Sequence, residues 1–529
     1  MAATAGEATD AGGQADALAE HVDVANAQAD PLPEHVDVAI VGGGFAGVGM
    51  AIALRRAGRT DFVVLERDDD VGGTWHQNTY PGCQCDVPSN LYSFSFAPNA
   101  AWSQTFPLQP EIGAYLKRVA DEFGVRPHVR TGTDVHDAAW DEQAQRWRVE
   151  TSRGTLTARV LVAGMGGLSE PALPEIPGAD DFAGPAFHTA RWNHDVDLTG
   201  KRVAVIGTGA SAVQVVPRIQ PQVAQLDVFQ RTPPWIMPHP GRPTRPRERA
   251  LFKALPLVQK LVRGAIYWGR ECYVLPFRFH RLSRIPQAMA LRHLERQVAD
   301  PILREQLTPR YEIGCKRILM SDEYFPALRQ PNAALITSAI ERVTPTGVVT
   351  ADGVEHPADA IVWGTGFHTT DLPYVAWLRG RGGRTLGDVW DERGMQALRG
   401  TTVAGFPNLF LLVGPNTLLG HTSVVFMIES QIAYVMDALR TLDAHGAVAC
   451  EPTPAAQDAF NATLQRRLRG TVWTKGGCAS WYLDAHGRNT TLWPGSSWTF
   501  RRATRRFDAA EYALQTPREA TAPSLAGVC

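Results

Sequence analysis

The stretch Val36–Gly47 reads VDVAIVGGGFAG and decides the fold. Its first half is a short apolar run, which is typical of a buried parallel strand. Its second half places Gly42, Gly44 and Gly47 in the spacing G-x-G-x-x-G, and Val48–Ala57 then has the pattern of a helix. The first glycine allows the tight turn, the second lets a pyrophosphate approach the backbone, and the third lets helix and strand pack closely. This segment predicts a dinucleotide held at a helix N-terminus.

The residue after the next strand indicates what the first site binds. Phe62–Leu65 has the pattern of the second strand, and Glu66 follows it directly. A carboxylate at this place suits the hydroxyls of a ribose. We therefore expect a complete βαβ unit with Glu66 as a cofactor-binding residue.

A second unit of the same kind begins at Arg202–Ile206. It carries Gly207, Gly209 and Ala212 in the fingerprint spacing, with a helix expected from about Ala210 to Ile219 and a strand at Leu226–Phe229. The run after this strand is Gln230-Arg231-Thr232, which has Arg231 and no acid, whereas the first unit has Glu66. An acid would repel a 2′-phosphate, whereas arginine pairs with it through two hydrogen bonds. The second site is predicted to prefer NADPH over NADH.

Two sites of opposite charge predict two different cofactors. The site that ends in Glu66 suits the adenosine of FAD, and the site that ends in Arg231 suits NADPH. A hydride would then pass from nicotinamide to flavin. This leaves disulfide reductases, N-hydroxylases, flavin monooxygenases and ketone monooxygenases open. No Cys-x-x-Cys or Cys-x-x-x-x-Cys follows the first fingerprint, which counts against a disulfide reductase.

Length and pattern together predict an α/β protein with two Rossmann-like domains and a helical insertion in the second. The 529 residues exceed one ordinary domain. We expect a disordered tail at 1–33 and an FAD-binding domain at 34–170 and 395–529. The NADPH-binding domain is expected at 171–240 and 308–394, with the insertion at 241–307. The first domain is expected to close with a strand at Leu409–Val413 and a long helix from about Ser423 to Leu442. The amphipathic part of the insertion, Ala250–Trp268, is expected to pack on its own domain and border the substrate cavity, with a membrane surface as the alternative.

Composition excludes several other classes of protein. The net charge of −2 offers no bulk basic field for nucleic acid. No apolar stretch reaches the ~18–20 residues of a membrane span, and no signal peptide is recognisable, so the cytoplasm is the expected compartment. The seven cysteines are odd in number and scattered, which predicts neither a disulfide framework nor a zinc or other metal site.

Further motifs narrow the class. Phe182, Gly184, His188 and Trp192 stand between the two fingerprints in the spacing F-x-G-x-x-x-H-x-x-x-W. This run resembles the identifying motif of type I Baeyer–Villiger monooxygenases, in which Pro or Asp more often stands where Asn193 does. The related flavin-containing monooxygenases carry Tyr in place of the Trp. Its position between the domains predicts a conformational role in a hinge.

Other segments resemble the same family from about Val36 to Phe500. They include Gly73-x-Trp75 with Tyr80-Pro81-Gly82 and Asp86, Ile313-Gly-Cys-Lys316-Arg317, Gly414-Pro415-Asn416 and the run around Trp481. Ala163-Gly-Met-Gly166 departs from the more usual Ala-Thr-Gly, and Trp363-Gly-Thr-Gly-Phe367 departs at Gly364.

The resemblance implies a role for each matching residue. Arg317 would be the catalytic arginine that stabilises a deprotonated flavin peroxide, since its charge persists at any working pH. Asp86 would be the active-site carboxylate that fixes the arginine and contacts the flavin side. Lys316 would bind the NADPH 2′-phosphate with Arg231, while Trp75 and Trp481 would lie against the cofactors. The implied reaction uses NADPH and O2 to convert a ketone into an ester or lactone.

Two other functions remain open at this stage. A flavin-containing monooxygenase that oxidises nitrogen or sulfur shares both cofactors, although Trp192 counts against it. A non-catalytic flavin-binding redox sensor would keep both nucleotide sites, although the retention of Asp86, Lys316 and Arg317 counts against that. The sequence does not indicate which ketone is used, the regioselectivity, the pathway, the oligomeric state or the role of the N-terminal tail.

Overall fold

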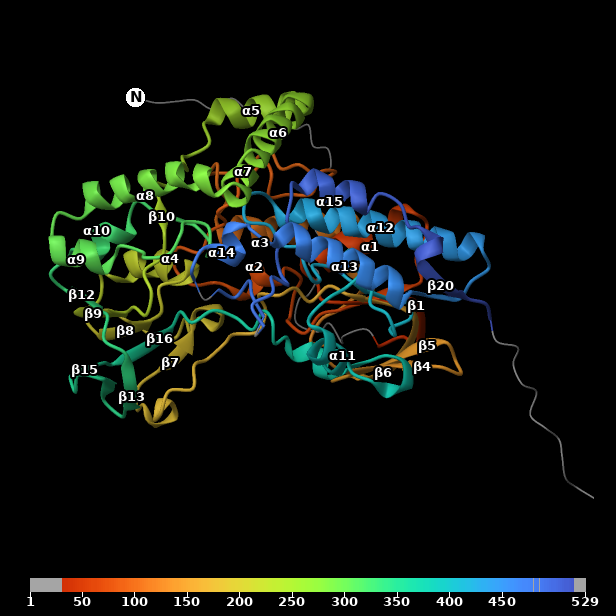
Figure 1. The fold of residues 1–529 in the computed structure, drawn as a ribbon, viewed down its shortest axis with the longest axis horizontal. Coiled ribbons are helices and arrows are strands. Elements are labelled where there is room, and N and C mark those ends of the chain that lie inside the picture. Colours follow the sequence, from red (N-terminus) through yellow and green to blue (C-terminus); the bar gives the residue numbers. More distant parts are fainter. Residues whose placement is uncertain (1–30, 479, 485, 518–529) are drawn as a thin grey trace, which may run out of the picture. The chain divides into compact units, whose positions relative to one another are not determined.

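The computed structural model describes residues 31–478, 480–484 and 486–517 (Figure 1). The predicted disordered tail at 1–33 therefore lies outside the described residues, apart from its last three positions.

The first fingerprint belongs to an eight-stranded mixed sheet. Its strands are β1 (His35–Val41), β2 (Phe62–Leu65), β3 (Val129–Arg130), β4 (Val135–Asp141), β5 (Arg146–Thr151), β6 (Gly154–Ala163), β17 (Leu378–Arg379) and β18 (Leu409–Leu411). Their order is β17-β4-β5-β6-β1-β2-β3, with β18 beside β6. Strand β1 pairs in parallel with both β2 and β6. Val38, Ala39 and Ile40 are fully buried, which explains why this strand is a continuous apolar run.

Helices from distant parts of the chain cover this sheet. Helix α1 (Phe45–Arg56) packs against α12 (Val424–Ala444), which lies beside it in Figure 1. The other elements of this domain are α2 (Thr74–Gln77), α3 (Gln109–Glu122), α11 (Leu386–Arg393), α13 (Pro454–Leu468), α14 (Val472–Lys475), α15 (Ser497–Ala503) and the strand pair β19 (Ala449–Pro452) and β20 (Tyr512–Gln515). The first domain therefore closes with a C-terminal segment, and most of the α12 side chains are buried.

The second fingerprint belongs to a separate sheet of five parallel strands in the order β12-β9-β8-β16-β7. These are β7 (Ala186–His188), β8 (Arg202–Ile206), β9 (Gln225–Phe229), β12 (Ala333–Ile336) and β16 (Ala360–Trp363). Around them lie α4 (Ala210–Ile219), α10 (Tyr324–Leu328), the pair β10 (Ile236–Met237) and β11 (Leu319–Met320), and the antiparallel strands β13 (Ile340–Thr344), β14 (Gly347–Thr350) and β15 (Glu355–Pro357). The predicted fold class, with two Rossmann-like domains, is confirmed.

One predicted boundary is wrong. The segment up to residue 394 was expected in the second domain, yet β17 pairs with β4 in the first sheet. Leu372, Leu378 and Leu386 are buried in the core of that sheet. The chain thus returns to the first domain about 20 residues early, because a two-residue edge strand carries too little sequence pattern to be recognised.

The insertion contains α5 (Pro246–Ala254), α6 (Pro256–Glu271), α7 (Val274–Arg278), α8 (Arg284–Gln297) and α9 (Pro301–Gln306). Contrary to expectation, α6 packs on the first domain rather than on its own. Gln259 Nε2 donates to Asn90 Oδ1 at 2.9 Å, and Arg263 Nη1 donates to Asn90 O at 2.7 Å. Tyr267 stacks on Phe426 of α12 with 5.0 Å between ring centroids. Among the described residues, no helix combines the length and the apolar character that crossing a bilayer requires.

Candidate active site

The turn between β1 and α1 is shaped to receive a phosphate. A Cβ at Gly47 would lie 1.8 Å from the carbonyl oxygen of Gly42, so only glycine permits this approach of helix and strand. Gly44 is the N-cap of α1, and no side chain caps the helix there. The N–H groups of the first turn are consequently available to an anion. The residues present fit the pyrophosphate of a dinucleotide.

Glu66 is held rigidly at the end of β2. Its Oε2 accepts a hydrogen bond from Gly43 N at 2.5 Å, and its Oε1 accepts one from Asp68 N at 3.0 Å. Burial raises the pKa of this carboxyl, although both N–H groups and the nearby Arg67 act in the opposite direction. The remaining lone pairs of the carboxylate can accept from ribose hydroxyls, which fits the adenosine of FAD.

The second turn repeats the first, with a difference in its final position. A Cβ at Gly207 would lie 2.3 Å from Gly364 O, and Gly207 has a φ of +111°. Ala212 is fully buried in place of the third glycine. A Cβ added at Gly364 would lie 3.2 Å from the Cβ of Ala212. The glycine at position 364, where this sequence departs from the family pattern, therefore leaves room for Ala212. Gly209 is the N-cap of α4 and again lacks a side-chain cap.

Two cations lie beside this second turn. Arg231 is exposed, and Lys316 is half-buried with its Nζ over the ring of Tyr311. Burial lowers the pKa of Lys316, and the charge of Arg231 lowers it further. Neither cation has an ion-pair partner among the described residues. Two cations that repel each other and lack a carboxylate fit a doubly charged phosphate, as in NADPH.

Asp86 and Arg317 form an ion pair that joins the two domains. Arg317 Nε donates to Asp86 Oδ2 at 2.8 Å, and Arg317 Nη2 donates to Oδ1 at 2.6 Å. Burial alone would raise the pKa of Asp86, but the charge and hydrogen bonds of Arg317 outweigh it and lower that pKa. The Asp86 charge raises the pKa of Arg317 in turn. The Arg317 side chain as a whole keeps 43% of its surface accessible.

A third charge belongs to this group. Arg270, in the last turn of α6, donates from Nη2 to the backbone oxygen of Asp86 at 3.4 Å. Burial lowers its pKa, while the Asp86 charge raises it. Its Nε is buried without a hydrogen-bond partner. One carboxylate therefore faces two guanidinium groups, which leaves the local field positive.

The segment before Asp86 holds the two nucleotide turns against each other. Tyr80 OH donates to Gln214 Oε1 at 2.8 Å, and Gln214 Nε2 donates to Gln84 O at 3.1 Å. Gln214 lies on α4, immediately after the second fingerprint. Trp75 is buried, and its Nε1 donates to Tyr92 OH at 3.0 Å.

The linker motif runs along the edge of the second sheet. Its glycine, Gly184, could not carry a Cβ, which would lie 2.7 Å from Asp359 O, and Phe182 packs on the core beside it. His188 pairs with Trp363 in the sheet, and its Nδ1 accepts from Ala190 N at 3.0 Å. Burial lowers the pKa of His188 to about 4, so the ring is neutral at ordinary pH. Trp192 packs edge-on against Phe187.

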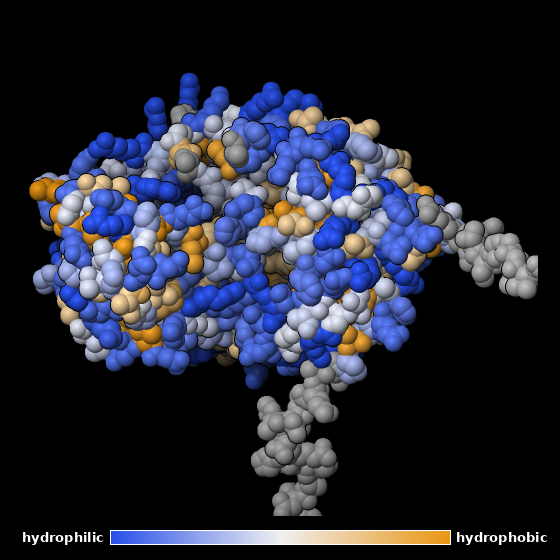
Figure 2. Space-filling model, turned by 90° about the horizontal axis from the view of Figure 1, so that it is seen from below, coloured by the Kyte–Doolittle hydropathy of each residue, from blue (hydrophilic) through white to orange (hydrophobic). Residues whose placement is uncertain are grey.

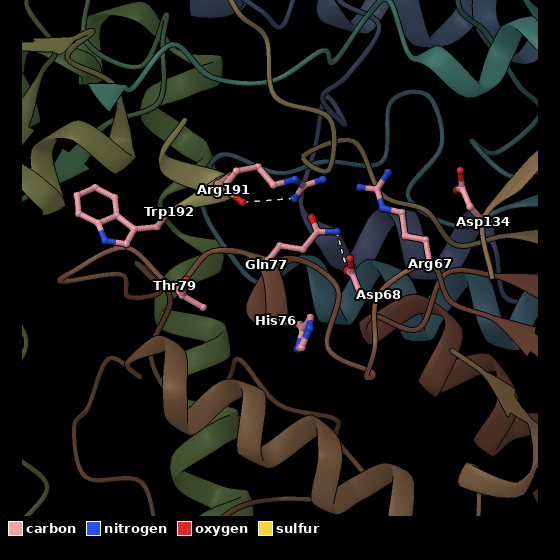
Figure 3. A pocket seen from close by; sticks show the side chains of 9 residues that line it. Arg67, Asp68, His76, Gln77, Thr79, Asp134, Arg191 and Trp192 are labelled. Carbon is pink, nitrogen blue, oxygen red and sulfur yellow. Dashed lines mark hydrogen bonds between the residues drawn. The ribbon is translucent and has the colours of Figure 1, made fainter. Parts of the chain in front are cut away.

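Two cavities adjoin these groups. The first, of about 510 Å³, lies between the FAD-side segment and the linker motif, and the guanidinium groups of Arg67 and Arg191 point toward one another in it (Figure 3). Neither Asp86 nor Arg317 lines this cavity. The second, of about 260 Å³, lies under α5 and α6 and is lined by Pro88 and Trp102 from the segment after Asp86 and by Val262 and Ile266 from α6.

The C-terminal segment brings an unexpected covalent link and a second aromatic side chain. Cys315, next to Lys316, is joined by a disulfide to Cys478, although the scattered cysteines predicted no disulfide framework. The fold brings together two residues 163 positions apart, which spacing alone does not reveal. Trp481 is half-buried and packs on Tyr482 at 4.4 Å. Tyr482 is buried, which raises its pKa to about 12, and it lies close enough to Arg317 for that charge to act on it.

Sequence reasoning missed three members of this group, namely Arg270, Tyr482 and Gln214. Arg270 is one of many arginines in the insertion, and only the packing of α6 on the Asp86 segment singles it out. Gln214 lies on a predicted helix, and its helical position relative to the fingerprint could have placed it at the domain interface.

Two dinucleotide sites of opposite charge, with an ion pair between them, define an oxidoreductase that uses two nucleotide cofactors. The family described as pyridine nucleotide-disulphide oxidoreductase matches residues 39–255, which contain both fingerprints. The chain is 54% identical over 485 residues to a Baeyer-Villiger monooxygenase of Streptomyces coelicolor, covering 91% of this chain and 93% of that one.

Solved structures agree with this assignment. An oxidized steroid monooxygenase bound to NADP has a TM-score of 0.80 and 33% identity, over 92% of this chain and all of that one. The OTEMO complex with FAD and NADP has a TM-score of 0.82 and 28% identity, over 90% and 99%. The chain belongs to the Baeyer–Villiger monooxygenases, which are FAD- and NADPH-dependent enzymes that oxidise ketones.

Proposed function

We propose that Asp86 and Arg317 are the catalytic pair of this enzyme, and that it converts an apolar ketone into an ester or lactone with O2 and NADPH in the cytoplasm. The observation that carries this proposal is the bidentate ion pair between the domains, whose arginine side chain keeps 43% of its surface accessible.

The two cofactors have separate sets of protein groups. The turn at Gly42–Gly47 and Glu66 would hold FAD, with Trp75 behind the turn. The turn at Gly207–Ala212, with Arg231 and Lys316, would hold NADPH. The bound flavin, once reduced by NADPH, supplies the activation of O2 for insertion beside the carbonyl.

Arg317 supplies a positive charge that no working pH removes, so it stabilises negative charge that develops on oxygen near it. Asp86 holds the guanidinium in one orientation through two hydrogen bonds. Because Asp86 cancels only one positive charge, Arg270 keeps the local field positive. The buried Tyr482 lies close enough to the pair for the charges of Arg317 and Asp86 to act on it.

The cavity under α5 and α6 supports an apolar substrate. Its walls include Phe106, Phe252, Val262 and Ile266, and it begins at the residues directly after Asp86. Eight of its sixteen lining residues are polar or charged, so the pocket combines apolar contacts with polar groups that can orient a small molecule.

Replacement of Arg317 by alanine tests the proposal. Arg317→Ala should still let NADPH reduce the flavin under anaerobic conditions, because Arg231 and Lys316 remain. Ester formation should fall by on the order of 10³-fold or more, since a preorganised charge at the reacting oxygen is lost. The matched control is Arg310→Ala, which removes an exposed arginine that pairs only with Glu305.

The assay should follow ester and hydrogen peroxide together, with apolar ketones of increasing size and a sulfide as second substrate. Normal ester yield from Arg317→Ala would remove Arg317 from the mechanism. Sulfide oxidation by the intact enzyme without any ester from ketones would replace ketone oxygenation with sulfur oxygenation.

A further inference from the structure

The insertion concentrates the exposed apolar surface of the molecule. Among the described residues, sixteen large hydrophobic side chains are exposed, and eleven of them lie between Leu251 and Met289. Single exposed hydrophobic residues are ordinary, but a cluster of this kind marks an interaction surface. By contrast, the face of the molecule opposite these helices is mainly hydrophilic outside its grey segments (Figure 2).

The exposed residues of α6 form one face of the helix. Leu257, Leu261 and Trp268 are exposed by 68%, 66% and 58%. Their spacing of four and seven residues places them on one side. The opposite side carries Gln259 and Arg263, which bind the loop after Asp86. The side of α6 that carries Leu257, Leu261 and Trp268 is therefore turned outward, and the helix lies at the upper edge of Figure 1.

Positive charge predominates around this apolar face. The segment Arg245–Arg296 contains twelve Arg or Lys against three Glu and no Asp, within a chain whose net charge is −2. Among the acids, Glu271 is buried against Ser497, Glu248 is paired with Arg242, and Glu295 is exposed on α8. The exposed cations include Lys253, Lys260, Arg278, Arg281 and Arg284.

We propose that this surface, made of the outer faces of α5 to α8, docks on an anionic lipid bilayer. Basic side chains around exposed Leu, Trp and Phe are the pattern of helices that lie in the interface, with cations at the phosphates and apolar groups below them. A second copy of the chain fits this surface poorly. A twofold contact would bring the same strongly basic face together with itself.

Docking would also place the lipid next to the cavity beneath α6. Val262 and Ile266 line that cavity from the same helix whose outer face carries Leu261 and Trp268. An apolar compound dissolved in the bilayer would then lie one helix away from the pocket. This consequence rests on the proposed function, whereas the lipid contact itself does not.

Vesicle sedimentation of the full chain with FAD bound tests the proposal. The probes are vesicles of phosphatidylcholine with phosphatidylglycerol and vesicles of phosphatidylcholine alone. The intact protein should sediment with the anionic vesicles and remain in solution with the neutral ones. The charge-reversal variant Lys253→Glu/Lys260→Glu should reduce binding by more than about 30-fold, since each lysine near an anionic surface contributes about a fivefold factor and each new glutamate adds repulsion.

A second variant separates lipid from other polyanions. Leu261→Ser/Trp268→Ser should weaken vesicle binding by roughly tenfold because apolar burial is lost, yet leave heparin binding unchanged. The matched controls are Leu173→Ser and Arg469→Glu, which change an exposed leucine and an exposed arginine outside the insertion. A flavin spectrum equal to that of the intact protein shows that each variant folds.

Three outcomes would overturn the proposal. They are equal binding to both kinds of vesicle, no binding to either, and a concentration-dependent dimer that Leu261→Ser/Trp268→Ser dissociates. The last would assign the surface to a second copy of the chain.

Discussion

The two glycine turns have the same backbone design but end in opposite kinds of site. In the first, the buried Glu66 carboxylate already accepts two backbone N–H groups. In the second, Arg231 and Lys316 repel each other and lack a carboxylate partner among the described residues. The carboxylate of the first site is already hydrogen-bonded before a cofactor binds. In the second site, the repulsion between the two cations is relieved only when an anion binds. This contrast suits a cofactor that stays bound and one that exchanges in each cycle.

Of the two cofactor sites, the one that contains Glu66 is expected to show the larger effect. Glu66→Ala should weaken FAD binding by about 100-fold or more, because hydrogen bonds to a charged acceptor contribute about 1.5–3 kcal/mol each. It also leaves the N–H groups of Gly43 and Asp68 without their acceptor. Fluorescence titration of the deflavinated protein with FAD measures the change.

Asp69→Ala is the matched control, since this neighbouring carboxylate is 89% exposed and pairs only with His76. Equal FAD affinity in the Glu66→Ala protein and the control would mean that Glu66 only supports the turn. The contrast between the two sites would then rest on the second site alone.

The second site should respond in a ligand-specific way. Arg231→Ala should raise the KM for NADPH by about 10- to 100-fold, which corresponds to one charge-assisted contact with the 2′-phosphate. The KM for NADH should hardly change. Relief of repulsion should also raise the pKa of Lys316, which NMR of labelled lysines can follow.

Arg218→Ala serves as the control, because Arg218 is a half-exposed cation of the same domain that pairs with Glu323. If Arg231→Ala weakened NADPH and NADH equally, the arginine would bind some part common to both nucleotides, and the 2′-phosphate assignment would fail.

The sequence predicted the fold closely where one element carries enough pattern to be recognised. Phe62–Leu65, Arg202–Ile206 and Ala210–Ile219 were predicted with the bounds that the structure has. The edge strand at Leu378 was missed because two residues have no periodicity. The insertion was recognised as helical, yet its packing partner was wrong, since amphipathic pattern indicates a buried face without identifying the surface that covers it.

The candidate site likewise contains residues that the sequence predicted and residues that it did not. Asp86 and Arg317 were paired by resemblance, and the structure brings them within hydrogen-bond distance across 231 positions. Arg270, Tyr482 and the Cys315–Cys478 disulfide depend on contacts between segments far apart in the chain. No local pattern marks such contacts.

His188 lies in the linker motif, and its replacement is expected to have the smallest effect, which concerns the pH dependence of stability. Burial lowers its pKa to about 4 in the folded protein, against about 6.5 when it is exposed to water. The unfolded chain therefore takes up the proton first as the pH falls. The stabilising contribution of the neutral ring is complete above pH ~6.5 and is lost between there and about pH 4.

His188→Asn, which does not titrate, should remove this dependence. The free energy of unfolding of the intact protein should fall by about 1 kcal/mol more than that of the variant between pH ~7.5 and ~5.5. Urea unfolding at both pH values measures this difference, with His445→Asn as an exposed control. Parallel pH profiles for His188→Asn and the intact protein would show that the linker opens before the domains unfold, so that His188 is already hydrated in the native state. In that case the linker would be the mobile part between two rigid sites, and the difference between those sites would arise from each turn separately.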